Sequence, residues 1–213
     1  MACGNSLFRN EETICTSCLF RLPKTKFHLD KNNPVSKVFW GRANIEMATA
    51  LYFYRKGGKV QSLIHHLKYH GQKEVGVFLG QLYGGQLKKT EYFKDVDIVI
   101  PIPLHKKRLK ERGFNQAETF AAGLSETMKI TMDTSSVYRN IATSTQTKKS
   151  RYKRWENVSE IFKIKESSRL ENKHVLIVDD VITTGSTMEA CINTLNTVEG
   201  IRVSVAAIAF ASH

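Results

Sequence analysis

Two adjacent aspartates that close an apolar run limit the folds open to this chain more than any other segment does. Residues 175–178 read Val-Leu-Ile-Val, Asp179 and Asp180 follow directly, and residues 183–187 read Thr-Thr-Gly-Ser-Thr. An apolar run without polar breaks is typical of a strand that is covered on both faces, as in a parallel sheet. Such sheets bind ligands beyond the carboxyl ends of their strands. We therefore expect an α/β domain with a binding site after residue 178.

The rest of the chain alternates between apolar strands and helical periods. Strands are expected within residues 43–54, 96–100, 173–178 and 201–210, and helices within residues 60–67, 73–87, 114–124 and 185–198. This alternation favours a largely parallel central sheet flanked by helices. The 213 residues, 41% of them hydrophobic, are enough for one sizeable core.

The charge balance points to an anionic partner. The 32 basic residues exceed the 20 acidic ones and give a net charge of +12, which suits phosphate, a nucleotide or nucleic acid. No run is long enough to span a bilayer, and the N-terminus has no basic region followed by an apolar stretch. We therefore expect a cytoplasmic protein.

The segment after the apolar run suits a phosphorylated sugar. Backbone N–H groups at the start of a helix can hold a phosphate, hydroxyl groups add donors, and glycine permits close approach. The predicted phosphate-binding residues are Thr183, Thr184, Gly185, Ser186 and Thr187. Asp179 and Asp180 can accept hydrogen bonds from ribose hydroxyls and help to hold Mg²⁺. In the competing interpretation the aspartates cap a helix and the loop is an ordinary turn.

Several motifs in order resemble those of a known family. Residues 175–187 resemble the phosphoribosyl pyrophosphate signature of type I phosphoribosyltransferases. Residues 66–71, His-Leu-Lys-Tyr-His-Gly, and residues 100–117, with Pro-Ile-Pro and Arg-Gly-Phe-Asn-Gln, resemble elements of the ComF family of competence-associated phosphoribosyltransferase-like proteins. A third element of that family has the spacing of Arg139, Thr143, Gln146, Arg154, Asn157 and Phe162. The resemblance covers most of the chain.

This resemblance implies a type I phosphoribosyltransferase-like domain at residues 34–213 that acts in competence and DNA uptake. It would bind phosphoribosyl pyrophosphate or a related nucleotide with Mg²⁺, and transfer the phosphoribosyl group to an unidentified nitrogenous acceptor. The alternative is a module without catalysis that binds a nucleotide or single-stranded DNA, with a competence helicase as a further candidate partner. Steep salt dependence of DNA binding would favour the module, and Mg²⁺-dependent pyrophosphate release would favour the enzyme.

The same resemblance identifies the residues after Ile100 as a pyrophosphate loop. Lys106, Lys107 and Arg108 would neutralise the charge that develops on pyrophosphate, and Arg112 follows closely. For the two lysines, a solvated basic face is the alternative. The candidate catalytic residues are Asp179, Asp180, Arg108 and Arg112.

Residues 144–157 combine five cations with little apolar periodicity, which predicts a mobile loop. In related enzymes such a loop closes over the substrate and excludes water. In the alternative interpretation it is a basic tether for nucleic acid, whose bases would stack on Tyr152 and Trp155.

Residues 1–33 are expected to form a Cys-containing N-terminal module. Cys15 and Cys18 form a Cys-x-x-Cys pair, and Cys3 resembles the end of a preceding pair in the zinc ribbon that begins many ComF-like proteins. All three are candidate zinc ligands, but a tetrahedral site needs a fourth. A start further upstream, a ligand such as His28 or water, and the absence of zinc are the alternatives. Cys191 is expected in the core.

Overall fold

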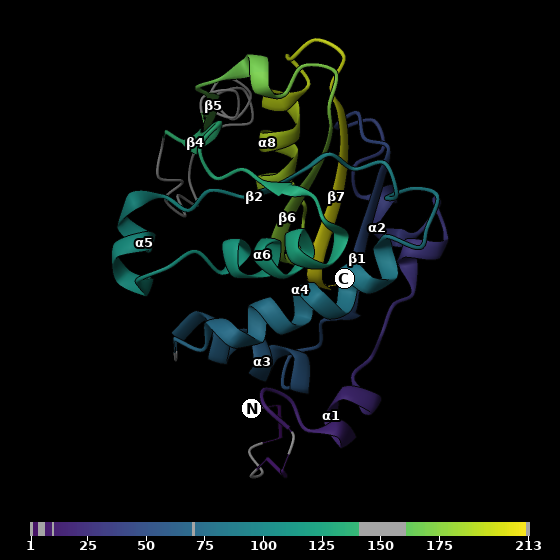
Figure 1. Cartoon of the computed structure of the whole chain (residues 1–213), viewed down its shortest axis with the longest axis vertical. Helices are drawn as coiled ribbons and strands as arrows, with labels where there is room; N and C mark the ends of the chain where they lie inside the picture. Colours follow the sequence, from purple (N-terminus) through teal and green to yellow (C-terminus); the bar gives the residue numbers. More distant parts are fainter. Residues whose placement is uncertain (1, 4–6, 10, 70, 141–160, 212–213) are drawn as a thin grey trace.

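A five-stranded parallel sheet forms the centre of the computed structural model, which describes residues 2–3, 7–9, 11–69, 71–140 and 161–211 (Figure 1). The strand order is β1-β7-β6-β2-β3, and every neighbouring pair is parallel. The strands are β1 (Met47–Phe53), β2 (Ile98–Pro101), β3 (Thr131–Met132), β6 (His174–Ile182) and β7 (Arg202–Phe210). The predicted parallel α/β architecture is thus confirmed.

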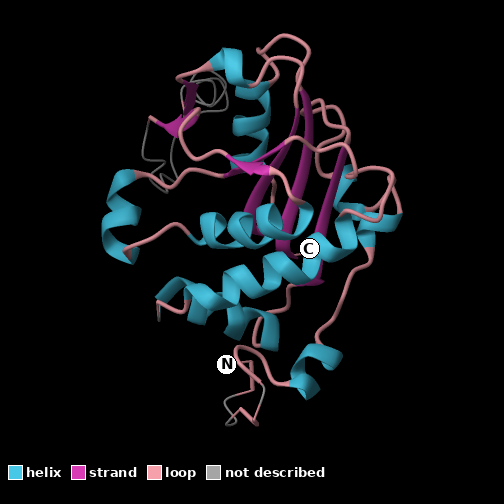
Figure 2. Cartoon of the chain, in the orientation of Figure 1, coloured by secondary structure: helices cyan, strands magenta, loops and turns pink. Residues whose placement is uncertain are grey.

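Helices cover the sheet, and a small antiparallel hairpin lies beside it (Figure 2). The hairpin consists of β4 (Val137–Arg139) and β5 (Phe162–Ile164). The helices are α1 (Thr16–Arg21), α2 (Pro34–Lys37), α3 (Lys59–Tyr69), α4 (Lys73–Leu87), α5 (Lys106–Arg112), α6 (Gln116–Met128) and α8 (Ser186–Leu195), with 3₁₀ turns η1 (Phe27–Leu29) and η2 (Ser167–Arg169). None of the helices in the described ranges has the length and hydrophobicity that a bilayer crossing requires.

The apolar run of β6 is buried on both faces. Leu176 and Val178 pack in the cluster that contains α3, α4 and α6, whereas Val175 and Ile177 pack in the cluster that contains α8. All four side chains are fully buried, and each such burial stabilises the fold by about 1.5–3 kcal/mol. The uninterrupted run in the sequence is therefore the consequence of two separate cores, one on each face.

Helices α4 and α6 touch backbone to backbone. A Cβ added to Gly80 would lie 2.2 Å from the carbonyl oxygen of Phe120, and one added to Gly123 would lie 2.1 Å from that of Val77. Only glycine leaves room for this approach. The contact fixes α6, whose first turn is capped by the side chain of Asn115.

The N-terminal residues are attached to the edge strand β1. Backbone hydrogen bonds join Thr25 N to the Leu51 oxygen, at 3.0 Å, and Phe53 N to the Pro23 oxygen, at 2.9 Å. Asn33 is buried and caps α2, and its amide also donates to the Ala48 oxygen at 2.8 Å. The division of the chain at residue 33 stays a prediction.

Two elements differ from their predicted form. Residues 106–112, which we expected as loop, form α5, because His105 accepts from the Lys107 amide at the start and Gly113 ends the helix with a φ of 77°. Strand β6 does not stop at Val178 but continues to Ile182, because β7 pairs with it as far as Phe210. The two aspartates therefore lie within the last part of the strand.

Candidate functional site

Asp179 and Asp180 extend past the end of the neighbouring strand. β2 ends at Pro101, which is level with Val178 on β6, so the two carboxylates emerge where one neighbour has stopped. Asp180 is buried and Asp179 half-buried, and the Asp180 amide donates to Oδ1 of Asp179 at 2.8 Å. Because successive strand residues point to opposite faces, the two side chains meet different partners.

The carboxyl group of Asp179 does not titrate as an ordinary aspartate. Burial and the neighbouring Asp180 carboxylate raise the pKa of Asp179 to about 7, although the Asp180 amide, Lys68 and Arg139 oppose this rise. Each opposing group favours the ionised form, and a further cation at the pair would act in the same direction. The pair is therefore a place where a bound cation or hydroxyl donor relieves an unfavourable charge arrangement.

Lys68 supplies a cation to one face of the pair. Its Nζ lies 2.6 Å from Oδ2 of Asp180, and its side chain is 22% exposed. It stands in the last turn of α3, whose buried side chains Ile64 and Leu67 pack against the core. Lys68 belongs to a recognised motif but was not among the predicted site residues, since the sequence does not show which strand the end of α3 faces.

Arg139 supplies a cation to the other face. It is the last residue of β4, and its guanidinium lies 5.5 Å from the centre of the Phe162 ring. Burial and the nearby charge of Arg108 lower its pKa, while Asp179 and Cys191 favour the charged form. The hairpin thus brings Arg139 within electrostatic reach of Asp179, and the predicted Arg108 of α5 lies close enough to act on Arg139.

The predicted phosphate loop turns from β6 into α8 as expected. Gly185 has a φ of +74° and precedes the first helical residue, and the hydroxyl residues 183, 184, 186 and 187 are exposed. A hollow of about 50 Å³ is lined by Asp179 and residues 181–188. This volume suits a single phosphate group, and the α8 amides at its start are the donors that such a group requires.

Arg42, from the N-terminal half of the chain, links the phosphate loop to the segment after α2. The Nη1 of Arg42 donates to the Thr184 oxygen at 3.0 Å and to the Val38 oxygen at 3.1 Å, and its Nη2 pairs with Glu189 of α8. A Cβ at Gly185 would lie 2.6 Å from Cγ1 of Val38. The segment after α2 therefore fixes the loop, and only glycine combines this contact with the positive φ.

The other predicted cations are not all at the acid pair. Lys106 and Lys107 are exposed on α5, which has no buried residue. Arg112 is half-buried and donates to Oε1 of Gln116 at 2.8 Å, while its guanidinium lies 5.8 Å from the centre of the Tyr69 ring. The structure places Arg108 near Arg139 and Arg112 beside the end of α3. Residues 144–157 lie outside the described residues.

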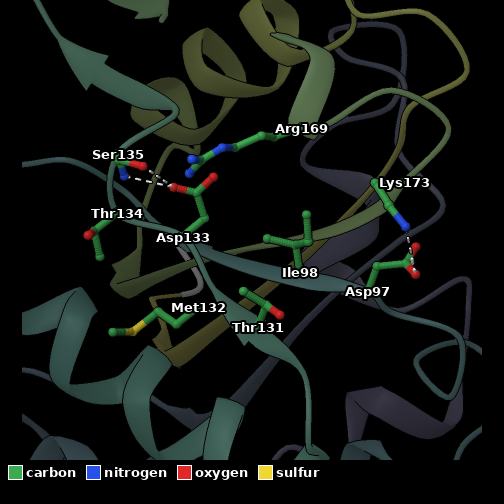
Figure 3. Close-up of a pocket in the computed structure, with 9 residues that line it drawn as sticks. All are labelled: Asp97, Ile98, Thr131, Met132, Asp133, Thr134, Ser135, Arg169 and Lys173. Carbon is green, nitrogen blue, oxygen red and sulfur yellow. Dashed lines mark hydrogen bonds and ion pairs between the residues drawn. The ribbon is translucent and has the colours of Figure 1, made fainter. Parts of the chain in front are cut away.

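A larger hollow of about 550 Å³ lies at the β3 edge of the sheet (Figure 3). Its lining residues are Asp97, Ile98, Thr131, Met132, Asp133, Thr134, Ser135, Arg169 and Lys173. Asp133 accepts from the Ser135 amide at 2.7 Å, and Lys173 pairs with Asp97 at 3.7 Å. No predicted site residue lines this hollow, and size alone does not identify the functional site.

The three predicted zinc ligands come together near the N-terminus. The sulfur atoms of Cys3, Cys15 and Cys18 all lie within 4.8 Å of one another, the only such group of possible ligands among the described residues. Burial and the hydrogen bonds of its protonated thiol with Cys15 and Cys3 raise the pKa of Cys18 to about 11. His28 is not in the group, because its ring is buried against Tyr83 at 5.7 Å.

Comparisons with known proteins agree with this geometry. Residues 109–213, which contain the acid pair and the phosphate loop, match the family model described as phosphoribosyl transferase domain. DNA utilization protein YhgH of Shigella flexneri is 31% identical over 184 residues, 84% of this chain and 76% of that protein. Competence protein ComFC of Bacillus subtilis is 26% identical over 195 residues, 85% of this chain and 77% of that protein.

Among solved structures, glutamine phosphoribosylpyrophosphate amidotransferase from B. subtilis aligns over 66% of this chain and 30% of its own, with 17% identity and a TM-score of 0.45. The parallel sheet and the matched family model define a phosphoribosyltransferase-type domain. Within that class, the chain belongs to the ComF family of competence and DNA-utilization proteins.

Proposed function

We propose that the chain binds phosphoribosyl pyrophosphate with Mg²⁺ at the end of β6 and transfers the phosphoribosyl group to a nitrogenous acceptor. One observation carries the proposal: two adjacent carboxylates and a phosphate-sized hollow at a helix start lie within nine consecutive residues, from Asp179 to Thr187. A sugar phosphate offers both hydroxyl donors for carboxylates and an anionic group for such a hollow. Lys68, Arg108 and Arg139 add positive charge where pyrophosphate would leave.

The donor set also fits Mg²⁺. This cation binds through one or two carboxylates together with phosphate oxygens, and Oδ2 of Asp180 already accommodates a cation in the form of the Lys68 ammonium group. When bound, Mg²⁺ would neutralise charge on the pyrophosphate group. The residues of the chain would position the ligand: the loop amides hold the 5′-phosphate and the aspartates accept from the ribose hydroxyls.

Transfer requires little covalent chemistry from the protein. The bond from the anomeric carbon to pyrophosphate breaks with its electron pair on the leaving oxygen, a bond from the acceptor nitrogen to that carbon forms, and the nitrogen loses a proton. Arg108 and Arg139, which lie close enough for one charge to act on the other, would stabilise the charge of the leaving group. Catalysis would therefore come from positioning and electrostatic stabilisation.

Calorimetric titration of phosphoribosyl pyrophosphate with Mg²⁺ tests the proposal. Wild type should bind, and Asp179→Asn/Asp180→Asn should abolish binding because both ribose acceptors and the cation site are lost. Glu91→Gln/Glu171→Gln is the matched control, since it removes the same charge from two exposed residues away from the site. A folded wild type that does not bind would overturn the ligand assignment.

A second candidate function is the binding of single-stranded DNA, favoured by α5 and its surroundings. α5 carries five basic residues and one acidic residue, and Arg112 stacks near Tyr69, whose side chain is 63% exposed. Exposed rings next to cations suit stacked bases and a phosphate backbone. Fluorescence anisotropy with an oligothymidine should show affinity that falls steeply with salt and weakens in Tyr69→Ala. Affinity that is independent of salt and of Tyr69 would exclude this surface.

The cysteine group suits zinc as a third part of the proposal. Three thiolates within reach of one ion match the ligand type of structural zinc sites, and the fourth ligand remains to be identified. Zinc content measured by mass spectrometry should be near one ion per chain and should fall in Cys15→Ser. An equal zinc content in both proteins would contradict the assignment.

A further inference from the structure

Lys68 holds the candidate site in a closed ion pair. Its Nζ is 2.6 Å from Oδ2 of Asp180, and the two side chains are 22% and 11% exposed. The pair is more sheltered than that of Lys173 with Asp97, whose side chains are 45% and 41% exposed. Shelter matters because water and salt screen exposed pairs strongly and partly buried pairs much less. Asp180 is therefore firmly occupied before any ligand arrives.

This occupation affects any divalent cation that approaches the pair. A metal ion at Oδ2 would lie close to the Lys68 ammonium group, and two cations on one carboxylate oxygen repel each other. Oδ1 of Asp179 is engaged as well, because it accepts from the Asp180 amide at 2.8 Å. Lys68 and a divalent cation are thus competitors for the same carboxylate.

A phosphate-bearing ligand offers the Lys68 ammonium group an alternative partner to the Asp180 carboxylate. The Lys68 ammonium group carries three donors on a flexible four-carbon stem, so it can exchange a carboxylate for a phosphate oxygen. The helix itself need not move, because the buried residues Ile64 and Leu67 fix α3 and only the side chain must turn. The released Asp180 oxygen is then open to a metal ion.

We propose that Lys68 is a positioning residue that excludes divalent cations from Asp180 until a phosphate-bearing ligand draws its side chain away. Metal ion and ligand then bind cooperatively, and the metal alone binds weakly. The inference rests on the proposed function for the nature of the ligand. On this proposal, Lys68 determines the order in which the metal ion and the ligand bind to the site.

The first test uses Mn²⁺ alone, with free metal measured by electron paramagnetic resonance. Lys68→Met should bind Mn²⁺ about ten-fold more tightly than wild type, a coupling of ordinary size. Lys173→Met removes the same charge from the opposite end of β6 and should leave the affinity unchanged. Adding Asp180→Asn to Lys68→Met should cancel the gain. Equal Mn²⁺ affinity in wild type and Lys68→Met would overturn the inference.

The second test measures cooperativity and separates this inference from the proposed function. Mn²⁺ should strengthen the binding of phosphoribosyl pyrophosphate more in wild type than in Lys68→Met, because only wild type has a lysine to displace. Equal strengthening in both proteins would overturn the role of Lys68, while leaving the proposed function intact. Wild type that binds Mn²⁺ but no phosphoribosyl pyrophosphate would contradict the proposed function instead. Lys68→Gln serves if Lys68→Met does not fold.

Discussion

The two ends of strand β6 carry similar side chains in opposite arrangements. At the amino end, His174 contacts Asp95 through Nδ1 at 3.0 Å and Ser204 through Nε2 at 2.8 Å, and Arg202 donates to Asp95 at 2.7 Å. At the carboxyl end, two carboxylates stand side by side next to an open hollow. The first group is a closed network in which each charge meets its partner, whereas the second places like charges together.

This difference separates a stabilising network from a binding site. The amino-end residues Ser204, His174 and Asp95 even have the hydroxyl, imidazole and carboxylate order of a hydrolase triad, but Ser204 is 0% exposed and His174 is 1% exposed. A substrate cannot reach a hydroxyl that no solvent reaches. The order of chemical groups therefore says less about function than their exposure to solvent and the presence of like charges side by side.

The largest effect is expected from His174→Ala at the amino end. The change leaves a cavity and removes the partner of the buried Ser204 hydroxyl, so the free energy of unfolding should fall by about 2–4 kcal/mol. Urea denaturation measures the loss. The folded variant should bind phosphoribosyl pyrophosphate as wild type does, and weakened binding with unchanged stability would break the comparison between the two ends.

Gly185→Ala should damage the carboxyl end more selectively. The positive φ costs about 1–2 kcal/mol for alanine, and the new methyl group meets Val38, so the phosphate loop must shift. We expect ligand affinity to fall about ten-fold or more in calorimetric titrations. Gly57→Ala is the matched control, because Gly57 has a φ of +75° with nothing within 4 Å of the added Cβ. Equal losses of affinity in both variants would contradict the claim that the contact between Gly185 and Val38 positions the phosphate loop.

Arg42→Ala should have a smaller effect of the same kind. Its side chain is 37% exposed, so the loss of its bonds to the loop should cost about 0.5–1 kcal/mol and reduce ligand affinity about two- to five-fold. Arg202→Ala removes an arginine of similar exposure at the amino end and should reduce stability alone. Parallel titration and denaturation of the two variants would show whether the two ends are independent.

The smallest effect is a pH dependence of opposite sign at the two ends. Burial opposes the ionisation of Asp95, but hydrogen bonds from Arg202 and His174 outweigh it and lower its pKa, so its stabilisation is present above about pH 4 and lost below. The raised pKa of Asp179 acts in reverse: stability falls as the pH rises from about 4 through about 7. Denaturation at pH 5 and pH 8 should show a relative gain for Asp179→Asn at pH 8. A relative loss would contradict the sign.

The sequence predicted most of the fold because local patterns and burial agree there. The apolar run of residues 175–178 identified a two-sided strand, and the helical period of residues 73–87 matched α4 to the residue. The extension of β6 to Ile182 was missed, since polar residues in a strand depend on pairing with β7, which is set by tertiary structure. α5 was missed because Leu109 is its single apolar residue and is exposed, so the basic segment shows no burial pattern from which a helix could be predicted.

Only part of the candidate site could be predicted from the sequence, because the rest depends on tertiary packing. Asp179, Asp180 and residues 183–187 are contiguous, so one segment displays them together. Lys68 precedes Asp180 by 112 positions and Arg139 precedes Asp179 by 40, so only the packing of α3 and of the β4–β5 hairpin shows that they reach the pair. Both residues lie in the family motifs, which indicate that they matter for function but do not show where they lie in the fold.

The most direct test compares one double variant at each end of β6. Ligand binding and the free energy of unfolding are measured on the same samples. Asp179→Asn/Asp180→Asn should abolish the binding of phosphoribosyl pyrophosphate with Mg²⁺ while the chain still folds cooperatively. Asp95→Asn/Asp97→Asn should lower that free energy and keep the binding. If the carboxyl-end variant bound the ligand like wild type, the site at the end of β6 would not be the binding site.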